Sequence, residues 1–252
     1  DTQMKYMGGK FFLCKEISSV MKSLVKPEDV DLYIEPFCGA LNVLKIMNED
    51  YKCFASDYHP DLIHLWKEVQ MNTFIPPESV DLEFYEKCKA LESPNALKAF
   101  IGFNMSFGGK FYAGYVDKYK RDKVENFLAE ATNSLNKIKD KIKDVDFQCL
   151  TYDSLKPRNS LIYCDPPYVP LSVTSSFTSY SKYDFDLEDQ HRLANRAKTS
   201  QSRGIRCVIS NHDLDITRKL YERSHIYEIN VQRSIASKSS SRGKVKEIIA
   251  VF

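Results

Sequence analysis

The stretch Leu161-Ile162-Tyr163-Cys164-Asp165-Pro166-Pro167-Tyr168 joins an apolar run to a pair of prolines. The β-branched and aromatic residues at its start are typical of a buried strand. The two prolines allow neither a helix nor strand pairing, so the chain leaves the strand end stiff and extended. The pattern therefore predicts an acidic side chain, Asp165, at the carboxyl end of a strand. A turn without further function is the alternative interpretation of a proline pair alone.

The groups that follow this strand suit a planar amino group. Such a group donates one hydrogen bond to the Asp165 carboxylate and one to the Pro166 carbonyl, while the ring that carries it stacks on Tyr168. The exocyclic amines of nucleobases have this shape. We therefore expect Asp165, Pro166 and Tyr168 to form a site for a nucleobase amine.

The composition is that of an ordinary globular protein. The chain has 252 residues, 43% hydrophobic and 28% charged, a length that suits one or two domains. No stretch reaches the roughly 20 apolar residues of a membrane span, and no signal-peptide pattern opens the chain, so we expect neither membrane insertion nor secretion. Seven scattered cysteines without a Cys-x-x-Cys pair predict reduced thiols and no metal site. Because the net charge is only +2, nucleic-acid binding would need basic residues gathered on one face.

The order of apolar runs predicts an α/β fold with a mostly parallel sheet. Runs typical of buried strands lie at 32–34, 54–56, 161–164 and 207–209. Amphipathic stretches at 41–47 and 187–199 separate them as helices would, and acids at 186 and 188 mark the start of the second helix. Alternating residues at 226–231 and 247–252 predict an antiparallel hairpin at the carboxyl end, joined by a serine-rich basic loop.

The middle of the chain differs in composition. Residues 65–148 are richer in Lys, Glu, Asn and aromatics, with helical patterns at 62–71 and 123–142. We therefore predict a catalytic domain made of 4–64 and 149–252, with a helical subdomain inserted at 65–148.

Two acidic segments follow the first two predicted strands. Glu35-Pro36-Phe37-Cys38-Gly39 lies where ligands settle in such sheets, and its glycine permits a tight turn. Asp57 follows the second strand, where an acid can accept hydrogen bonds from ribose hydroxyls; a solvated acid is the alternative. Neither a Gly-x-Gly-x-x-Gly nor a Walker pattern is present, so a nucleoside-like ligand without phosphates is favoured.

Three further segments have compositions that suit nucleic acid. Residues 104–115 mix glycine and aromatic residues with Lys110, which suits base stacking and phosphate contact, although a packed edge is the alternative. Residues 233–244 offer hydroxyl and cationic donors, and a solvated loop is the alternative there. Lys5-Tyr6-Met7-Gly8-Gly9-Lys10 combines charge, an aromatic ring and two glycines, as a surface turn also would. For residues 210–213, which contain His212, no catalytic relay is evident, so we expect them to organise a loop.

Taken in order, these segments resemble the Dam-type DNA adenine-N6 methyltransferases. The motifs that carry the resemblance are Lys5-Tyr-x-Gly-Gly-Lys10, Glu35-Pro-Phe-x-Gly39, Asp57-x-x-x-Asp61-Leu-Ile63, Tyr163-Cys-Asp-Pro-Pro-Tyr-x-Pro-Leu-Ser172, Phe177-Thr-x-Tyr180, Ile209-Ser-Asn-His-Asp213 and Arg233-Ser-Ile235. The resemblance implies a class I methyltransferase domain with a Rossmann-like fold. It also implies methyl transfer from S-adenosylmethionine to adenine N6 in duplex DNA, with S-adenosylhomocysteine as product, no metal, and the base flipped out of the helix.

The resemblance assigns expected roles to individual residues. Catalytic roles fall to Asp165, Pro166 and Tyr168. Cofactor contacts are expected from Tyr6, Lys10, Glu35, Phe37, Gly39, Asp57 and Asp165. DNA contacts are expected from Lys5, Lys110, Tyr112, Arg233, Ser234, Lys238, Arg242 and Lys244. We expect a monomer in solution, with room for more than one copy on DNA, in the compartment of its DNA, cytoplasmic or associated with the nucleoid.

The chain also departs from the family pattern. Leu41 stands where the first motif usually continues to a second glycine, and residues 104–121 match the family's specificity segment poorly. The GATC recognition sequence is therefore not expected to carry over. Cytosine-N4 methylation, RNA adenine methylation and a catalytically silent DNA-binding homologue stay open as alternatives at this point.

Overall fold

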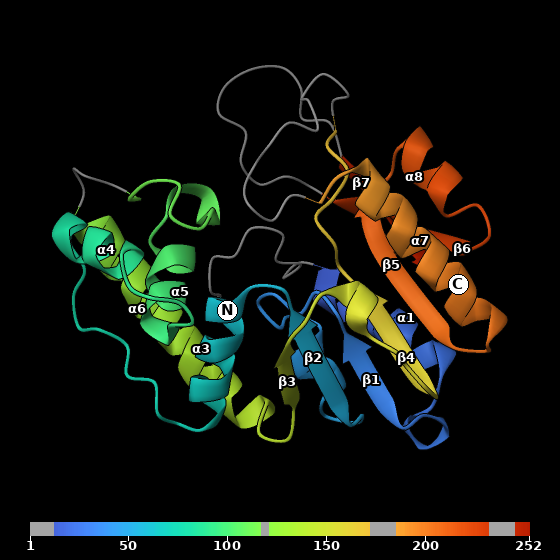
Figure 1. Cartoon of the computed structure of the whole chain (residues 1–252), viewed down its shortest axis with the longest axis horizontal. Coiled ribbons are helices and arrows are strands. Elements are labelled where there is room, and N and C mark those ends of the chain that lie inside the picture. The colour runs from blue at the N-terminus through green and yellow to red at the C-terminus, as the bar shows by residue number, and fades with distance from the viewer. Residues whose placement is uncertain (1–12, 117–120, 172–184, 232–244) are drawn as a thin grey trace.

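The computed structural model describes residues 13–116, 121–171, 185–231 and 245–252, and a seven-stranded sheet is their central element (Figure 1). The strand order is β3-β2-β1-β4-β5-β7-β6. The strands are β1 (Leu32–Glu35), β2 (Cys53–Asp57), β3 (Asp146–Cys149), β4 (Ser160–Cys164), β5 (Arg206–His212), β6 (His225–Val231) and β7 (Val245–Val251). The first five are parallel, and β7 runs antiparallel to both β5 and β6. The mostly parallel sheet with an antiparallel carboxyl-terminal hairpin is as predicted.

Helices cover both faces of the sheet. The α-helices are α1 (Cys14–Leu24), α2 (Leu44–Met47), α3 (Pro60–Gln70), α4 (Leu82–Lys89), α5 (Ala96–Asn104), α6 (Arg121–Ile138), α7 (Leu187–Ser202) and α8 (Asp215–Leu220). Short 3-10 turns are η2 (Pro27–Asp29), η3 (Phe107–Gly109), η4 (Lys139–Lys141) and η5 (Tyr152–Ser154). Residues of α1, α2 and α3 to α6 share one hydrophobic cluster with one face of the sheet, whereas α7 and α8 cover the other face.

Side-chain alternation along the strands explains the two layers. Tyr33 and Tyr163 belong to the cluster on the α1 face, whereas Ile34, Ile162 and Cys164 belong to the cluster on the α7 face. Every residue of β4 is buried, as expected of a parallel strand covered on both sides. The continuous apolar run before Asp165 is therefore the sequence signature of a central strand.

The helix predicted at 41–47 is much shorter in the structure, where α2 spans only Leu44–Met47. The residues before it form turns instead, because the backbone is left-handed at Gly39 (φ 46°) and at Leu41 (φ 63°). The helix predicted at 187–199 is confirmed as α7. Its first turn is closed by a capping box, in which the Asp186 carboxylate accepts from the Asp189 N–H at 2.8 Å.

The helices of the middle segment gather beside the β3 edge of the sheet, on the left in Figure 1. Their buried residues continue the cluster on the α1 face without a break. The chain rejoins the sheet at Asp146, before the predicted boundary at 148, and α3 begins at Pro60, before the predicted boundary at 65. The division into two domains stays a prediction.

No helix within the described ranges has the length and apolar character needed to cross a membrane.

A close contact inside the insert generates the first prediction. A methyl group added at Gly102 of α5 would lie 2.5 Å from ring carbons of both Phe111 and Tyr112. Helix propensity alone would make Gly102→Ala stabilising by about 1 kcal/mol, whereas overpacking costs about 1–3 kcal/mol. We expect a net loss in the free energy of unfolding, measured by urea denaturation. An unchanged or higher stability would show that the two rings move aside freely.

Candidate active site

Acidic side chains meet at the carboxyl ends of three neighbouring strands. Glu35 is the last residue of β1, Asp57 is the last residue of β2, and Asp165 directly follows β4. The sheet order places β1 between β2 and β4, with all three strands parallel. The three carboxyl groups therefore share one edge of the sheet, where ligands of open α/β sheets bind.

Asp57 is tied to the turn after β1. Its carboxylate accepts hydrogen bonds from the Gly39 N–H at 3.2 Å and from the His59 N–H at 3.1 Å. Burial raises the pKa of Asp57 to about 6, and the hydrogen bonds from the backbone oppose that rise. Since only 3% of Asp57 is exposed, the ordinary solvated acid that was the alternative interpretation is excluded.

The turn between β1 and α2 is held from both sides. While the Gly39 N–H faces Asp57, the Gly39 carbonyl accepts from the indole N–H of Trp66 in α3 at 2.9 Å. Leu41 keeps the left-handed backbone (φ 63°) that favours glycine. Its side chain is completely buried, and that burial offsets the strain of about 1 kcal/mol. The missing second glycine of the motif therefore leaves the turn intact.

Glu35 is as deeply buried as Asp57. It accepts a hydrogen bond from the Tyr33 hydroxyl at 2.6 Å, and 3% of it is exposed. Burial raises the pKa of Glu35 to about 8; the bond from Tyr33 opposes this rise, and the charge of Asp165 adds to it. Glu35 is therefore protonated at neutral pH in the protein without ligand.

Asp165 is half-buried and rests on β5. Its carboxylate accepts from the Ser210 hydroxyl at 3.3 Å, and the Ser210 and Tyr163 hydroxyl oxygens lie 2.9 Å apart. These hydroxyl groups come from two adjacent strands, so the orientation of Asp165 depends on the register of β4 against β5.

Tyr168 is oriented by two side chains. Its hydroxyl donates to Glu247 of β7 at 3.2 Å, and its ring meets that of His212 edge-on, with centroids 4.8 Å apart. Burial, with the charge of Asp165 added, raises the pKa of Tyr168 well above its usual range. Glu247 was missed by sequence reasoning, although a lone acid within the apolar run of the last strand is a signal that could have found it.

Two amide side chains bind the backbone on either side of Tyr168, at Pro167 and Val169. The Gln190 side chain donates to the Pro167 carbonyl at 2.7 Å, and the Asn211 carbonyl oxygen accepts from the Val169 N–H at 3.0 Å. His212 Nδ1 lies 2.8 Å from the Val169 carbonyl and must donate to it. These contacts agree with the loop-organising role expected of residues 210–213, which prove to be the end of β5 and the residue after it.

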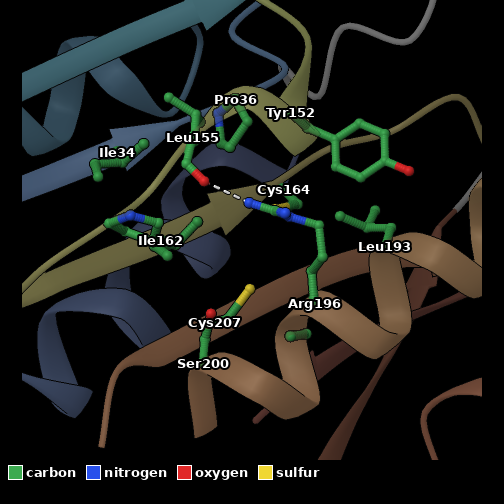
Figure 2. Close-up of a pocket in the computed structure, with 12 residues that line it drawn as sticks. Ile34, Pro36, Tyr152, Leu155, Ile162, Cys164, Leu193, Arg196, Ser200 and Cys207 are labelled. Atoms are coloured by element: carbon green, nitrogen blue, oxygen red, sulfur yellow. Dashed lines mark hydrogen bonds between the residues drawn. The ribbon is translucent and has the colours of Figure 1, made fainter. Parts of the chain in front are cut away.

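Phe37 belongs to an aromatic cluster at the edge of the site. Its ring stacks on Tyr152 at 5.5 Å and meets Phe185 edge-on at 5.6 Å. A small hollow continues from here between the sheet and α7 (Figure 2). Arg196 reaches across the hollow and donates to the Leu155 carbonyl. The hollow lies on the α7 face, whereas Glu35 and its partner Tyr33 belong to the opposite face.

The loop at 104–116 places its aromatic residues differently from expectation. Tyr112 is buried, its hydroxyl donates to the Lys98 carbonyl at 2.7 Å, and its N–H donates to the Ser106 hydroxyl at 2.9 Å. Such a buried ring is not available for the DNA contact expected of Tyr112. Phe107 is the aromatic side chain that this loop exposes, by 72%, and Lys110 nearby is exposed as well.

The other expected site residues lie outside the described part of the chain. They are Lys5, Tyr6, Lys10, Arg233, Ser234, Lys238, Arg242 and Lys244. Within the described part, no group of three or more His, Cys, Asp or Glu side chains is arranged to hold a metal ion.

The raised pKa of Glu35 generates the second prediction. The folded protein keeps this proton up to about pH 8, whereas the unfolded chain releases it near its ordinary value of 4.5. Between these values the titration of Glu35 by itself lowers stability by about 1.4 kcal/mol per pH unit, and Glu35→Gln removes this contribution while leaving those of other groups. We expect the variant to gain stability relative to wild type from pH 5 to pH 8, measured by denaturation without ligand. A constant difference would contradict a protonated Glu35.

Comparisons with known proteins identify the family of this chain. The model of the D12 class N6 adenine-specific DNA methyltransferase family matches residues 6–108 and 98–235. A DNA adenine methylase of Vibrio cholerae is 32% identical over 285 aligned positions, which cover 99% of this chain and 95% of the relative. A DNA adenine methylase of Escherichia coli K12 is also 32% identical, with 99% and 94% covered. One from Haemophilus influenzae is 30% identical, with 99% and 92% covered.

These matches decide between the chemistries that the motif Asp165–Tyr168 left open. The family acts on adenine in DNA, which favours that substrate over cytosine N4 or RNA. The chain belongs to the D12 class of N6 adenine-specific DNA methyltransferases.

Proposed function

We propose that this DNA adenine methyltransferase takes its methyl group from S-adenosylmethionine and acts on an adenine flipped out of duplex DNA. The observation that carries the proposal is the meeting of Glu35, Asp57 and Asp165 at one edge of the sheet. Asp57 is assigned to the donor side and Asp165 to the contact between donor and base.

The residues present fit S-adenosylmethionine. Buried acids with raised pKa values are unfavourable in the protein alone, and a ligand that brings positive charge and several donors offsets that cost. We assign Asp57 to hydrogen bonds with the ribose hydroxyls and the Phe37 ring to an apolar contact with the ligand. Glu35 and Gly39 are assigned to the part of the binding site that lies between Asp57 and Phe37. When bound, the donor supplies an electrophilic methyl group on a positively charged sulfur.

Asp165, Pro166 and Tyr168 are assigned to the adenine. The adenine amine is a poor nucleophile because its lone pair is delocalised into the ring. Hydrogen bonds to the Asp165 carboxylate and the Pro166 carbonyl favour a pyramidal nitrogen, whose lone pair is then free to react. The Tyr168 ring supports the base by stacking, and its orientation is set by Glu247 and His212. Positioning, rather than covalent catalysis, supplies most of the rate.

The DNA is assigned to the side of the insert that carries Phe107 and Lys110. An adenine in a duplex cannot reach a site between strand ends, so the base must leave the stack. An exposed aromatic side chain on a glycine loop suits insertion between bases, and the exposed lysine suits a phosphate. We assign target recognition to the insert, and we keep the expectations of a monomer in solution and of a location in the compartment of the DNA.

The central test is Asp165→Ala. The Asp165 carboxylate accepts its amine hydrogen bond chiefly in the reacting geometry, so the turnover rate should fall by at least about a thousandfold while the fold survives. Transfer of labelled methyl to DNA measures the rate, and circular dichroism checks the fold. Near wild-type turnover by a folded variant would refute both the assigned site and the catalytic role of Asp165.

Asp57→Asn tests the donor side of the site. The amide keeps the shape of the carboxylate, but a charge-assisted hydrogen bond worth about 1.5–3 kcal/mol is lost, which predicts a roughly ten- to hundredfold weaker affinity for S-adenosylmethionine. Titration calorimetry measures this affinity. Asp146→Ala is the control, since Asp146 is an exposed acid at the far end of the adjacent strand β3. Equal affinities for S-adenosylmethionine in both variants would show that residues other than Asp57 bind the ribose.

Phe107→Ala and Lys110→Ala test the DNA side and should differ in kind. Lys110→Ala removes a phosphate contact, so it should weaken binding to all DNA sequences and reduce the salt dependence of binding by about one ion. Phe107→Ala removes the ring that inserts between bases, so it should lower methylation and change the sequence preference. Binding at several salt concentrations and methylation of a sequence library measure the two effects. Ile75→Ala, which truncates another exposed apolar side chain, is the control. Exchanged phenotypes would contradict these assignments.

A further inference from the structure

The short segment Pro167–Val169 carries the ring that we assign to the target base, and two buried amides bind its backbone. Gln190 lies in the first turn of α7, and Asn211 lies near the end of β5. Only 1% of Gln190 and none of Asn211 is exposed. Amides buried to this degree need hydrogen bonds that repay their desolvation.

The hydrogen bonds of Asn211 account for its whole side chain. Its oxygen accepts from the Val169 N–H at 3.0 Å and from the His212 N–H at 2.9 Å. Its nitrogen donates to the Gln190 carbonyl oxygen at 3.2 Å and to the Tyr221 hydroxyl at 3.1 Å. With both acceptor sites and both donors used, the amide has one orientation and cannot rotate without losing partners.

Gln190 transmits this fixed orientation to the proline segment. Its oxygen is held by Asn211, so its nitrogen is directed at the Pro167 carbonyl, 2.7 Å away. Because proline has no N–H, that carbonyl is the main backbone group through which this stiff part of the chain can form a hydrogen bond. The Pro167 carbonyl is part of the peptide group that joins Pro167 to Tyr168, so the direction of this carbonyl fixes the backbone position from which the Tyr168 ring projects.

We propose that Gln190 and Asn211 are positioning residues for methyl transfer, which hold the Pro167–Val169 backbone so that the Pro166 carbonyl and the Tyr168 ring face the target amine. This inference rests on the proposed role of Asp165–Tyr168. Neither amide touches the reacting atoms; both act through the backbone of this segment. Small displacements of a catalytic constellation, of about 1 Å, cost up to about a hundredfold in rate.

The alternative is that the amides only dock α7 on the sheet. A docking role predicts lower stability with an unchanged rate, as long as the protein is measured well below its unfolding temperature. A positioning role predicts a lower kcat in the folded protein, with little change in substrate binding. The two readings therefore separate when kcat, KM and melting temperature are measured together.

The experiment uses Gln190→Met, which keeps the length of the side chain and removes its hydrogen bonds. We expect kcat to fall by about ten- to a hundredfold, while KM for DNA and the affinity for S-adenosylmethionine change less than about threefold. Gln190→Asn keeps the amide but is too short to reach the Pro167 carbonyl, and we expect the same loss. It provides a second measurement if Gln190→Met does not fold.

Two controls bracket these variants. Gln201→Met removes an exposed amide on the same helix, where Gln201 donates to the Arg223 carbonyl, and should leave all values unchanged. Leu193→Ala truncates a buried apolar side chain by which the same helix packs on the sheet and leaves both amides in place, so it should lower the melting temperature while kcat stays near wild type.

The outcomes distinguish the inference from the function on which it rests. An inactive Asp165→Ala with a wild-type kcat in folded Gln190→Met and Gln190→Asn would overturn the positioning role alone. An active Asp165→Ala would overturn the assigned site itself. A kcat loss in the Gln190 variants that is matched by Leu193→Ala at equal loss of stability would show a docking role, and would also overturn the inference.

Discussion

The parallel pairing of β2, β1 and β4 is the constraint on which the rest of the site depends. Pairing in this order brings Glu35, Asp57 and Asp165 to one edge, although they are far apart along the chain. Burial raises the pKa values of Glu35 and Asp57, and the charge of Asp165 adds to the rise at Glu35. The fold tolerates them because each accepts a hydrogen bond: Glu35 from the Tyr33 hydroxyl of β1, Asp57 from the Gly39 N–H in the turn after β1, and Asp165 from the Ser210 hydroxyl of β5.

The loops at this edge are held from opposite faces of the sheet. On the α1 face, Trp66 fixes the Gly39 turn, which in turn holds Asp57. On the α7 face, Gln190 and Asn211 bind the backbone on either side of Tyr168. The loop assigned to the methyl donor and the loop assigned to the base are therefore held by different side chains. A substitution at Trp66 need not disturb the backbone around Tyr168, and a substitution at Gln190 need not disturb the Gly39 turn.

Much of this arrangement could be predicted from local sequence. An apolar run predicts a central strand, and an acid directly after it predicts a polar group at the sheet edge, which is how Asp57 and Asp165 were found. The proline pair restricts its own backbone, so the extended exit from β4 is a local property. The helix expected at 41–47 is shortened to Leu44–Met47 for the opposite reason, since a long-range contact from Trp66 to the Gly39 carbonyl favours a turn before it.

By itself, the sequence determined the strands β1, β2, β4, β5, β6 and β7, the acids at the strand ends and the family, because each depends on residues adjacent in the chain. The edge strand β3 was missed, since it begins within the segment that was predicted to be helical. Only the tertiary structure decided which side chains support the site. Gln190, Asn211 and Glu247 reach it from α7, β5 and β7, and no local pattern reveals which residues meet across a sheet. Burial also depends on packing: Tyr112 and Phe107 lie in the same glycine loop, yet one is in the core and the other is exposed.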